Sequence, residues 1–493
     1  MTALDTPQVQ RWPARIGELP GRRALALGAL ALVSGLLGGD MIIHVIAVPR
    51  VAQYFAVGSA TAWLAGSIGA VVLAACLLSV GALGDRFGRR RVLLGGVLAV
   101  AVGAVVTAYA QDSTIFLAGR AITGAGLAAS FGTALAIVAA LFPPGDLPRV
   151  FGVWLGIQSV TTMAAGVVGA ALIDGTTWRT GYFLTGMVAV LLVVPGWMTI
   201  PDSRAATPRR LDPAGVLSAS AALALLVGGI YRAAGRGWTD PVVLCALAGA
   251  AVSAALFAWW ELRDAEPAVP LRRLATASFG ATCLTGVLAG FAAAVVAVQT
   301  ITALHDHRGL SVSMAMVVAV PLSLGMVLGA DLAAQAQERG WATPALYVSG
   351  LICCGTGILA LARVGAGAEL WVYSAVCAVV GFGAMWAQNP QAAALMSALP
   401  ADSSGVLAAV KTAVAQVGFA LGLGVAAAMV AAFPGGAPAG SDAAYFHGFP
   451  RGMAVIGVLL LAGAVSVAVL QRPWALTTDG PDAIEPGGPA VEA

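Results

Sequence analysis

Long apolar stretches recur from one end of this 493-residue chain to the other. A helix needs roughly 20 apolar residues to cross a bilayer core of about 30 Å, and stretches of that length are repeated many times here. Only 10% of the residues are charged, whereas soluble domains carry roughly 25%. The stretches are rich in Ala, Leu and Gly and lack the alternation of barrel strands. We therefore expect an all-α integral membrane protein.

The apolar stretches predict fourteen membrane helices, arranged as six, two and six. Two charged loops, PDSRAATPRRLDP and ELRDAEPAVPLRRL, separate the three groups. The expected spans are 24–48, 58–80, 92–110, 114–141, 150–173, 181–200, 213–231, 241–260, 277–304, 311–333, 344–362, 370–397, 404–432 and 451–471. The expected segments are a cytoplasmic N-terminal segment 1–23, a six-helix bundle 24–200, an inserted helix pair with flanking loops 201–276, a second six-helix bundle 277–471 and a disordered cytoplasmic tail 472–493.

The basic residues predict the orientation, because an even number of spans places both termini on one side. Two of the 26 basic residues, Arg120 and Lys411, fall within spans. With the N-terminus inside, the outer segments hold only Arg50, Arg179, Arg232, Arg236, Arg308, Arg363 and Arg451. The remaining basic residues lie in the inner segments, and this excess of positive charge on the inner side follows the positive-inside rule. We expect a multi-pass protein of the cytoplasmic membrane with both termini in the cytoplasm.

The composition argues against several classes of function. A net charge of +3 is too small for a nucleic-acid footprint. The six cysteines all lie in apolar stretches, where they are expected to be small core residues. Among the four histidines, the pair in HDHRG is too sparse for a metal site, and no phosphate-binding loop or nucleophile–base pair is visible. We expect no cofactor, no metal, no nucleic-acid partner and no enzymatic activity.

The stretch GALGDRFGRRRVLL, Gly81 to Leu94, concentrates charge between the second and third predicted spans. It resembles the signature of the loop between helices 2 and 3 in the major facilitator superfamily. The signature residues are Gly81, Asp85, Arg86, Gly88, Arg89 and Arg90. The layout of fourteen helices with an inserted pair resembles the drug:proton antiporter branch of that family.

The resemblance implies a fold and an activity. The fold would be two six-helix bundles plus the inserted pair, rocking to alternate access to a central cavity. The activity would be export of small hydrophobic or amphiphilic compounds, such as drugs or antibiotics, in exchange for protons. The partners would be the small-molecule substrate, protons and the lipid bilayer, and we expect a monomer.

The chemistry of the charged stretch suits a gate that holds the cytoplasmic side closed. Glycines permit close helix approach and a tight turn. Asp85 precedes a helix whose dipole favours an anion, and arginines bond carboxylates and backbone carbonyls of neighbouring helices. The simpler alternative, a positive-inside anchor, would need only the arginines and would not explain Asp85 or the glycines.

Two further stretches extend the resemblance, and one departs from it. DMIIHVIAVP carries the acid and proline of the helix-1 pattern, and LAGRAITGAGLAAS carries the arginine and glycines of the helix-4 motif. The helix-5 pattern has a Gly-Pro pair, whereas MAAGVVGAAL keeps Gly166 and Gly169 but has Val167 in place of the proline. A small-residue face still permits close packing, but the kink is lost. This departure is the best support for the alternative of a proton-coupled importer of a small metabolite. A non-transporting receptor or scaffold is the third alternative.

Ionisable residues inside spans cost several kcal/mol and are functional candidates by default. Asp40 is the first candidate for proton coupling, and the alternative is a structural carboxylate permanently paired to a cation. His44 lies one turn further on and is a candidate relay or a plain hydrogen-bonding residue. In the family the arginine that matches Arg120 is associated with proton coupling. Arg120 would therefore either stabilise the negative charge of Asp40 during coupling or form a fixed ion pair with it that serves only packing.

Lys411, the only lysine, has three candidate roles: to counter an acidic substrate, to pair with an acid, or to snorkel toward the cytoplasm. Other polar and aromatic residues in spans would line a largely apolar cavity or make interhelical hydrogen bonds. The cavity candidates are Trp63, Gln158, Gln299, Trp386, Asn389, Lys411 and Gln416.

Overall fold

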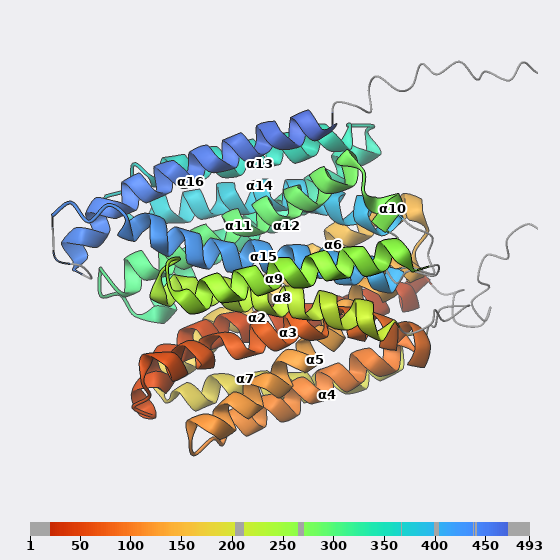
Figure 1. The fold of residues 1–493 in the computed structure, drawn as a ribbon, viewed down its shortest axis with the longest axis horizontal. Coiled ribbons are helices and arrows are strands. Elements are labelled where there is room, and N and C mark those ends of the chain that lie inside the picture. The colour runs from red at the N-terminus through yellow and green to blue at the C-terminus, as the bar shows by residue number, and fades with distance from the viewer. Residues whose placement is uncertain are drawn as a thin grey trace, which may run out of the picture.

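Long helices joined by short loops make up the computed structural model, which describes residues 20–202, 212–264, 271–365, 367–398, 404–436, 438 and 441–471 (Figure 1). The helices of the first half are α2 (Pro20–Tyr54), α3 (Ser59–Phe87), α4 (Arg89–Ala108), α5 (Ser113–Leu141), α6 (Leu147–Gly175) and α7 (Trp178–Thr199), with a 3-10 turn at Pro144–Asp146. The others are α8 (Pro213–Arg236), α9 (Pro241–Arg263), α10 (Leu271–Leu274), α11 (Ala277–His305), α12 (Val312–Glu338), α13 (Thr343–Leu361), α14 (Leu370–Ser397), α15 (Ser404–Ala431) and α16 (Asp442–Gln471).

The prediction of an all-helical membrane protein is confirmed. Among the described residues, thirteen helices are long and apolar enough to cross a membrane, and α3, bent by 51° after Leu77, raises the number to as many as 14. Each predicted span corresponds to one long helix, and no strand occurs within the described ranges. The predictions for the tail 472–493 and for nearly all of the segment 1–23 lie outside those ranges.

The largest differences from the predicted boundaries lie at the charged stretch and at α16. The stretch 81–91 was expected to be a loop, but α3 continues to Phe87 and α4 begins at Arg89. The helices change direction at Gly88 alone, whose φ of 101° is a conformation that favours glycine. Helix α16 begins at Asp442 and runs through Pro450, so the polar residues before the apolar stretch are also helical.

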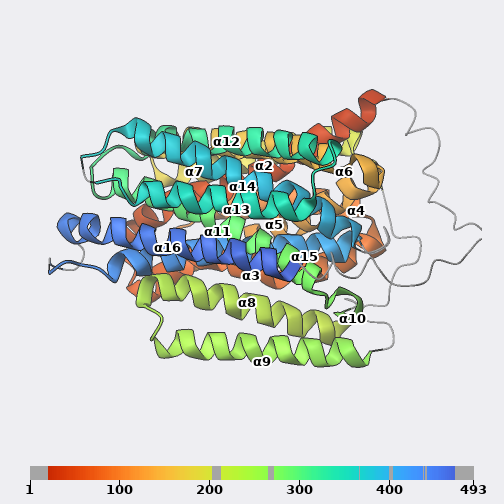
Figure 2. The ribbon, with the colours of Figure 1, turned by 90° about the horizontal axis from the view of Figure 1, so that it is seen from above.

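The long helices pack as two bundles with a third element beside them. Helices α2–α7 pack on one another as the first bundle, and α11–α16 as the second bundle. Helix α8 packs on α3 of the first bundle and on α15 of the second, and α9 packs on α8 (Figure 2). The inserted pair therefore covers one line along which the bundles meet, and α6 and α12 pack together along another.

Both ends of the helical region lie on one side of the molecule. We call the side at which α2 begins and α16 ends the terminal side (Figures 1 and 2). Toward the terminal side, one apolar cluster joins the bundles and includes Phe151 and Trp154 of α6, Met396 of α14 and Leu407 of α15. Gly152 permits the close approach, because a Cβ there would lie 3.2 Å from the Ala330 carbonyl oxygen of α12.

Candidate functional site

A buried ion pair joins α2 to α5 inside the first bundle. Arg120 Nη1 donates to Asp40 Oδ1 at 3.2 Å, and Nη2 donates to Oδ2 at 3.0 Å. The side chains are 2% and 0% exposed, so the pair is screened neither by water nor by salt. Such bidentate contacts, with two parallel N–H···O bonds, are the strongest form of the arginine–carboxylate pair. Gly69 of α3 leaves room for the guanidinium, since a Cβ there would be 3.4 Å from Nη2.

Tyr182 of α7 connects this pair to His44. Nδ1 of His44 lies 2.8 Å from the Tyr182 hydroxyl, with the proton's position set by the tautomer. The Tyr182 ring centroid is 5.4 Å from the Arg120 guanidinium carbon, within reach of a cation–π contact. Asp40, His44, Arg120 and Tyr182 thus form one group, which we call the buried polar cluster. All four are buried, on helices α2, α5 and α7.

The structure brings together the three residues chosen from sequence for proton coupling and adds a fourth. Tyr182 lies in the stretch TTWRTGYF, but a single tyrosine in an apolar helix carries no charge that would single it out. The cluster contains an acid, an imidazole, a phenol and a cation. Protonating Asp40 would leave Arg120 buried without a counter-charge, which is costly unless the surroundings rearrange.

The charged stretch clamps three helices of the first bundle together. Arg89 donates to Asp85 Oδ1 from Nε at 3.0 Å and from Nη2 at 2.7 Å, tying the start of α4 to the end of α3. Arg90 donates to the Ile200 carbonyl at 3.3 Å, and its guanidinium stacks 4.6 Å from the Trp197 ring centroid at the end of α7. Of the other signature residues, Gly81 and Gly88 are buried and Arg86 is exposed.

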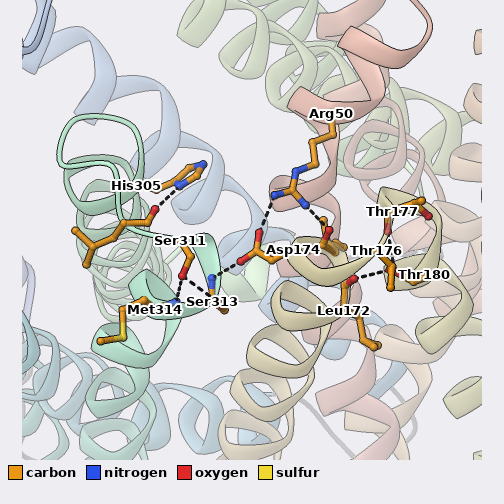
Figure 3. A network of polar contacts seen from close by, with 12 residues as sticks. Arg50, Leu172, Asp174, Thr176, Thr177, Thr180, His305, Ser311, Ser313 and Met314 are labelled. Carbon is orange, nitrogen blue, oxygen red and sulfur yellow. Dashed lines mark hydrogen bonds and ion pairs between the residues drawn. The ribbon is translucent and has the colours of Figure 1, made fainter.

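A second set of contacts links the two bundles at the side opposite the terminal side (Figure 3). Arg50 of α2 donates from Nη2 to Asp174 Oδ1 at 2.7 Å and from Nη1 to the Ile173 carbonyl at 2.6 Å. The other oxygen of Asp174 accepts from the backbone N–H of Ser313 at 3.0 Å. Asp174 lies in the last turn of α6 and Ser313 in the first turn of α12, so one carboxylate joins the bundles. We call this contact the Asp174 tie. The sequence analysis did not single out Asp174, which looks like an ordinary charge at a helix end.

The small residues of α6 pack as expected despite the missing proline. A Cβ at Gly166 would lie 2.9 Å from Met316 Cε of α12, and one at Gly169 would lie 2.5 Å from Ile43 Cγ1 of α2. Neither position has room for a larger side chain. The only proline of α6 is in its first turn, so its remainder has no proline kink.

Some of the cavity candidates make hydrogen bonds within the second bundle, and others lie on α6 and α15. Gln299 accepts from the Tyr445 hydroxyl at 3.0 Å, and Trp386 Nε1 donates to Ser349 Oγ at 2.9 Å, both within the second bundle. Asn389 is fully buried and donates to the Ala330 carbonyl at 2.7 Å, close to Gly152 of the first bundle. The Trp63 side chain lies outside the described part of the structure.

The remaining candidates lie on α6 and α15. Lys411 places its ammonium 5.9 Å from the centroid of the Trp154 ring, across the boundary between the bundles. Gln158, one turn from Trp154, has a buried Oε1 without a hydrogen-bond partner. Gln416 is partly buried on α15.

The two histidines of HDHRG make separate contacts. His305 Nδ1 lies 2.7 Å from the Leu310 carbonyl oxygen, and His307 Nδ1 lies 2.8 Å from Asp442 Oδ1. Within the described ranges, no group of three His, Cys, Asp or Glu side chains is placed to hold a metal ion.

The buried pair predicts strong coupling between its two partners. Asp40→Leu or Arg120→Met alone leaves an uncompensated buried charge, which costs about 3–5 kcal/mol. Combining the two changes removes both charges, so the loss of thermal stability in detergent should be well below the sum of the single losses. The matched control is the partly exposed pair Arg50–Asp174, where Arg50→Met and Asp174→Ala should be additive within about 1 kcal/mol. Additive losses at Asp40 and Arg120 would contradict the buried pair.

Comparisons with known proteins place the chain in a family. The model of the Major Facilitator Superfamily matches residues 30–423. Over 415 residues the chain is 27% identical to the tetracenomycin C resistance and export protein of Streptomyces glaucescens, covering 84% of this chain and 77% of the relative. It is 26% identical to the multidrug efflux pump LfrA of Mycolicibacterium smegmatis, covering 84% of this chain and 82% of the relative.

A solved structure shows the same fold. The human organic anion transporter MFSD10 matches with a TM-score of 0.62 over 91% of this chain and 100% of its own, at 18% identity. At that identity the likeness concerns the fold alone. The family model spans most of the sequence, and the relatives are named for export and efflux, so the protein is a transporter rather than an enzyme: the chain belongs to the Major Facilitator Superfamily.

Proposed function

We propose that this protein exports small hydrophobic or amphiphilic compounds, such as drugs or antibiotics, in exchange for protons. The observation that carries the proposal is the buried Asp40–Arg120 pair, the best-enclosed ion pair of the described residues. The relatives named for resistance and export support the direction of transport. The sparse polar groups between the bundles suit a substrate that is mostly apolar.

In the proposed proton step, Asp40 alternates between a carboxylate paired with Arg120 and a protonated acid. A proton arriving from outside neutralises Asp40 and releases the guanidinium. Tyr182 and His44 lie beside the pair and provide a path of hydrogen-bonding groups for the proton or for the displaced guanidinium. Because an unpaired buried cation is costly, protonation favours a different arrangement of α2, α5 and α7. That linkage would make substrate release depend on protonation.

In the proposed alternation, contacts on the two sides of the molecule form and break in turn. On the terminal side, the apolar cluster around Trp154 holds the closed arrangement. The Asp85–Arg89 contact ties α3 to α4, so the signature residues contribute to the gate by keeping the terminal end of the first bundle rigid. On the opposite side, the Asp174 tie must break when the bundles separate there. The terminal side faces the cytoplasm of the cell, the protein lies in the cytoplasmic membrane, and it acts as a monomer without a nucleic-acid partner.

Import remains a second candidate because α6 has no proline beyond its first turn. A proton-coupled importer of a small metabolite would use the same ion pair with the opposite direction of substrate movement. Deleting an importer would slow growth on its nutrient, whereas deleting an exporter would raise sensitivity to toxic compounds.

The direct test follows protons in inside-out membrane vesicles that contain the protein. The vesicles are energised to an acid interior, and lipophilic antibiotics and dyes are added while a pH-sensitive fluorophore reports proton release. We expect compound-dependent release by the wild type and none by Asp40→Asn. The matched control is Asp112→Asn, an acid that caps α5 on its own, which should behave as the wild type. Release that survives Asp40→Asn would place coupling elsewhere, and no release with any compound would contradict antiport.

The Asp174 tie predicts a shift in the balance between the two conformations. Asp174→Ala removes the acceptor for the Ser313 N–H and the partner of Arg50, interactions worth about 1–2 kcal/mol together. The population opened on that side should therefore rise about 5- to 30-fold. Electron spin distances between labels at Thr177 and Asp306, on a cysteine-free background, measure the opening.

The control for this shift is Asp112→Ala, which removes an acid on the same side that caps its own helix. It should leave the distance distribution between the two labels unchanged. Unchanged distances in Asp174→Ala would show that the tie does not hold the bundles together.

A further inference from the structure

Lys411 is a cation inside a spanning helix, and no acidic side chain of the described residues pairs with it. It is the only lysine of the chain and lies seven residues after the start of α15, about 10 Å along the helix. None of the ion pairs formed by the described residues includes it. Of the three roles suggested by sequence, pairing with an acid is thus not observed within the described ranges. A cation kept in this place needs another source of negative charge.

The direction of the side chain argues against simple snorkelling. The ammonium lies 5.9 Å from the Trp154 ring centroid of α6, in the other bundle. Trp154 is itself seven residues from the start of α6, so the two residues lie at the same depth. Leu407 and Ala408, one turn before Lys411 on α15, belong to the apolar cluster that closes the terminal side. Lys411 therefore lies one turn deeper in the membrane than the buried residues of this apolar cluster on α15, and its ammonium points toward the first bundle.

Two buried polar atoms of α6, one on Trp154 and one on the residue a turn further along, have no hydrogen-bond partner among the described residues. Trp154 is 1% exposed, and its Nε1–H donor has no hydrogen-bond partner. The buried Oε1 of Gln158, one turn further along α6, has none either. Buried polar groups are normally satisfied, so unpartnered ones at a functional boundary point to a missing ligand. The Lys411 ammonium and the indole N–H of Trp154 provide donors for an anion, and the indole ring provides an aromatic surface for a planar molecule. The unpartnered Gln158 Oε1 is an acceptor and suits a hydroxyl or N–H group of the same ligand.

We propose that Lys411 and Trp154 form a subsite for the acidic group of a substrate that also has a planar aromatic part, and that Gln158 Oε1 accepts from a hydroxyl or N–H group of the same substrate. The inference rests on the proposed export function and names its substrate class as aromatic carboxylates or acidic phenols. A purely mechanical contact between the bundles would be made better by Leu or Met, which would cover Trp154 without desolvating a charge. The anion would supply the counter-charge that the described residues do not place near Lys411.

The test compares three ligands of the same shape with the purified protein in detergent. The probes are a naphthalene carboxylate, the matching carboxamide and the matching aminomethyl compound, with affinities measured by isothermal titration calorimetry. Wild type should bind the carboxylate about tenfold more tightly than the carboxamide, the effect of one charge-assisted hydrogen bond. In Lys411→Gln this ratio should fall to about one, because the charge that distinguishes the two ligands is gone.

Two charge variants of Lys411 sharpen the comparison. Lys411→Arg should keep the preference for the carboxylate, and Lys411→Glu should favour the aminomethyl compound. Arg339→Gln is the matched control, since it removes an exposed positive charge near the end of α12 without touching the boundary between the bundles. Its affinity ratio should equal that of the wild type.

The outcomes separate this subsite from the proposed function. A ratio near one in the wild type, or a high ratio that persists in Lys411→Gln, overturns the subsite even if the vesicles release protons with neutral compounds. Conversely, a carboxylate-to-carboxamide affinity ratio that depends on Lys411 supports the subsite. If the vesicles release no protons with any compound, that result contradicts only the proposed export in exchange for protons and leaves the subsite standing. Melting curves of each variant confirm that affinities are compared between folded proteins.

Discussion

Inside a bilayer core, a charge must be met by another group of the protein or by a bound ligand, because no water is present to solvate it. The Asp40–Arg120 pair meets this constraint with both carboxylate oxygens and both terminal nitrogens engaged. The pair joins α2 to α5, and Tyr182 extends it to α7, so the first bundle is organised around one polar centre. Any event that changes the charge of Asp40 must therefore disturb the packing of three helices.

The rest of the structure provides ways to convert that disturbance into movement. The charged stretch binds α3, α4 and α7 together through Arg89 and Arg90, so these helices are expected to move as a unit. Across the boundary between the bundles the contacts are of two kinds. Apolar packing occurs around Trp154 on the terminal side and around Met316 of α12 nearer the other side, and the Asp174 tie is a polar contact on that other side. Both kinds are individually modest in strength, which suits contacts that must break in each transport cycle.

The helices could be predicted from sequence because each apolar stretch is long and uninterrupted, and the family signature could be read from residues close together in the chain. The exact ends could not, because the helical state of Gly81–Phe87 depends on a turn made by Gly88 alone. Within the site, Asp40 and Arg120 stood out as rare intramembrane charges. Tyr182 and Asp174 did not, since their importance comes from partners far away in the sequence. Which of the three roles Lys411 would take depended on Trp154, more than 250 residues earlier.

The central claim is that Asp40 changes its protonation state when substrate binds. Infrared difference spectroscopy on the reconstituted protein measures this directly, since a protonated carboxyl group has a C=O stretch distinct from that of a carboxylate. The account predicts that adding a transported compound changes a protonated-carboxyl band in the wild type and in Asp112→Asn, and that this change is absent in Asp40→Asn. A change of the same size in Asp40→Asn would show that another acid carries the proton and would contradict the account.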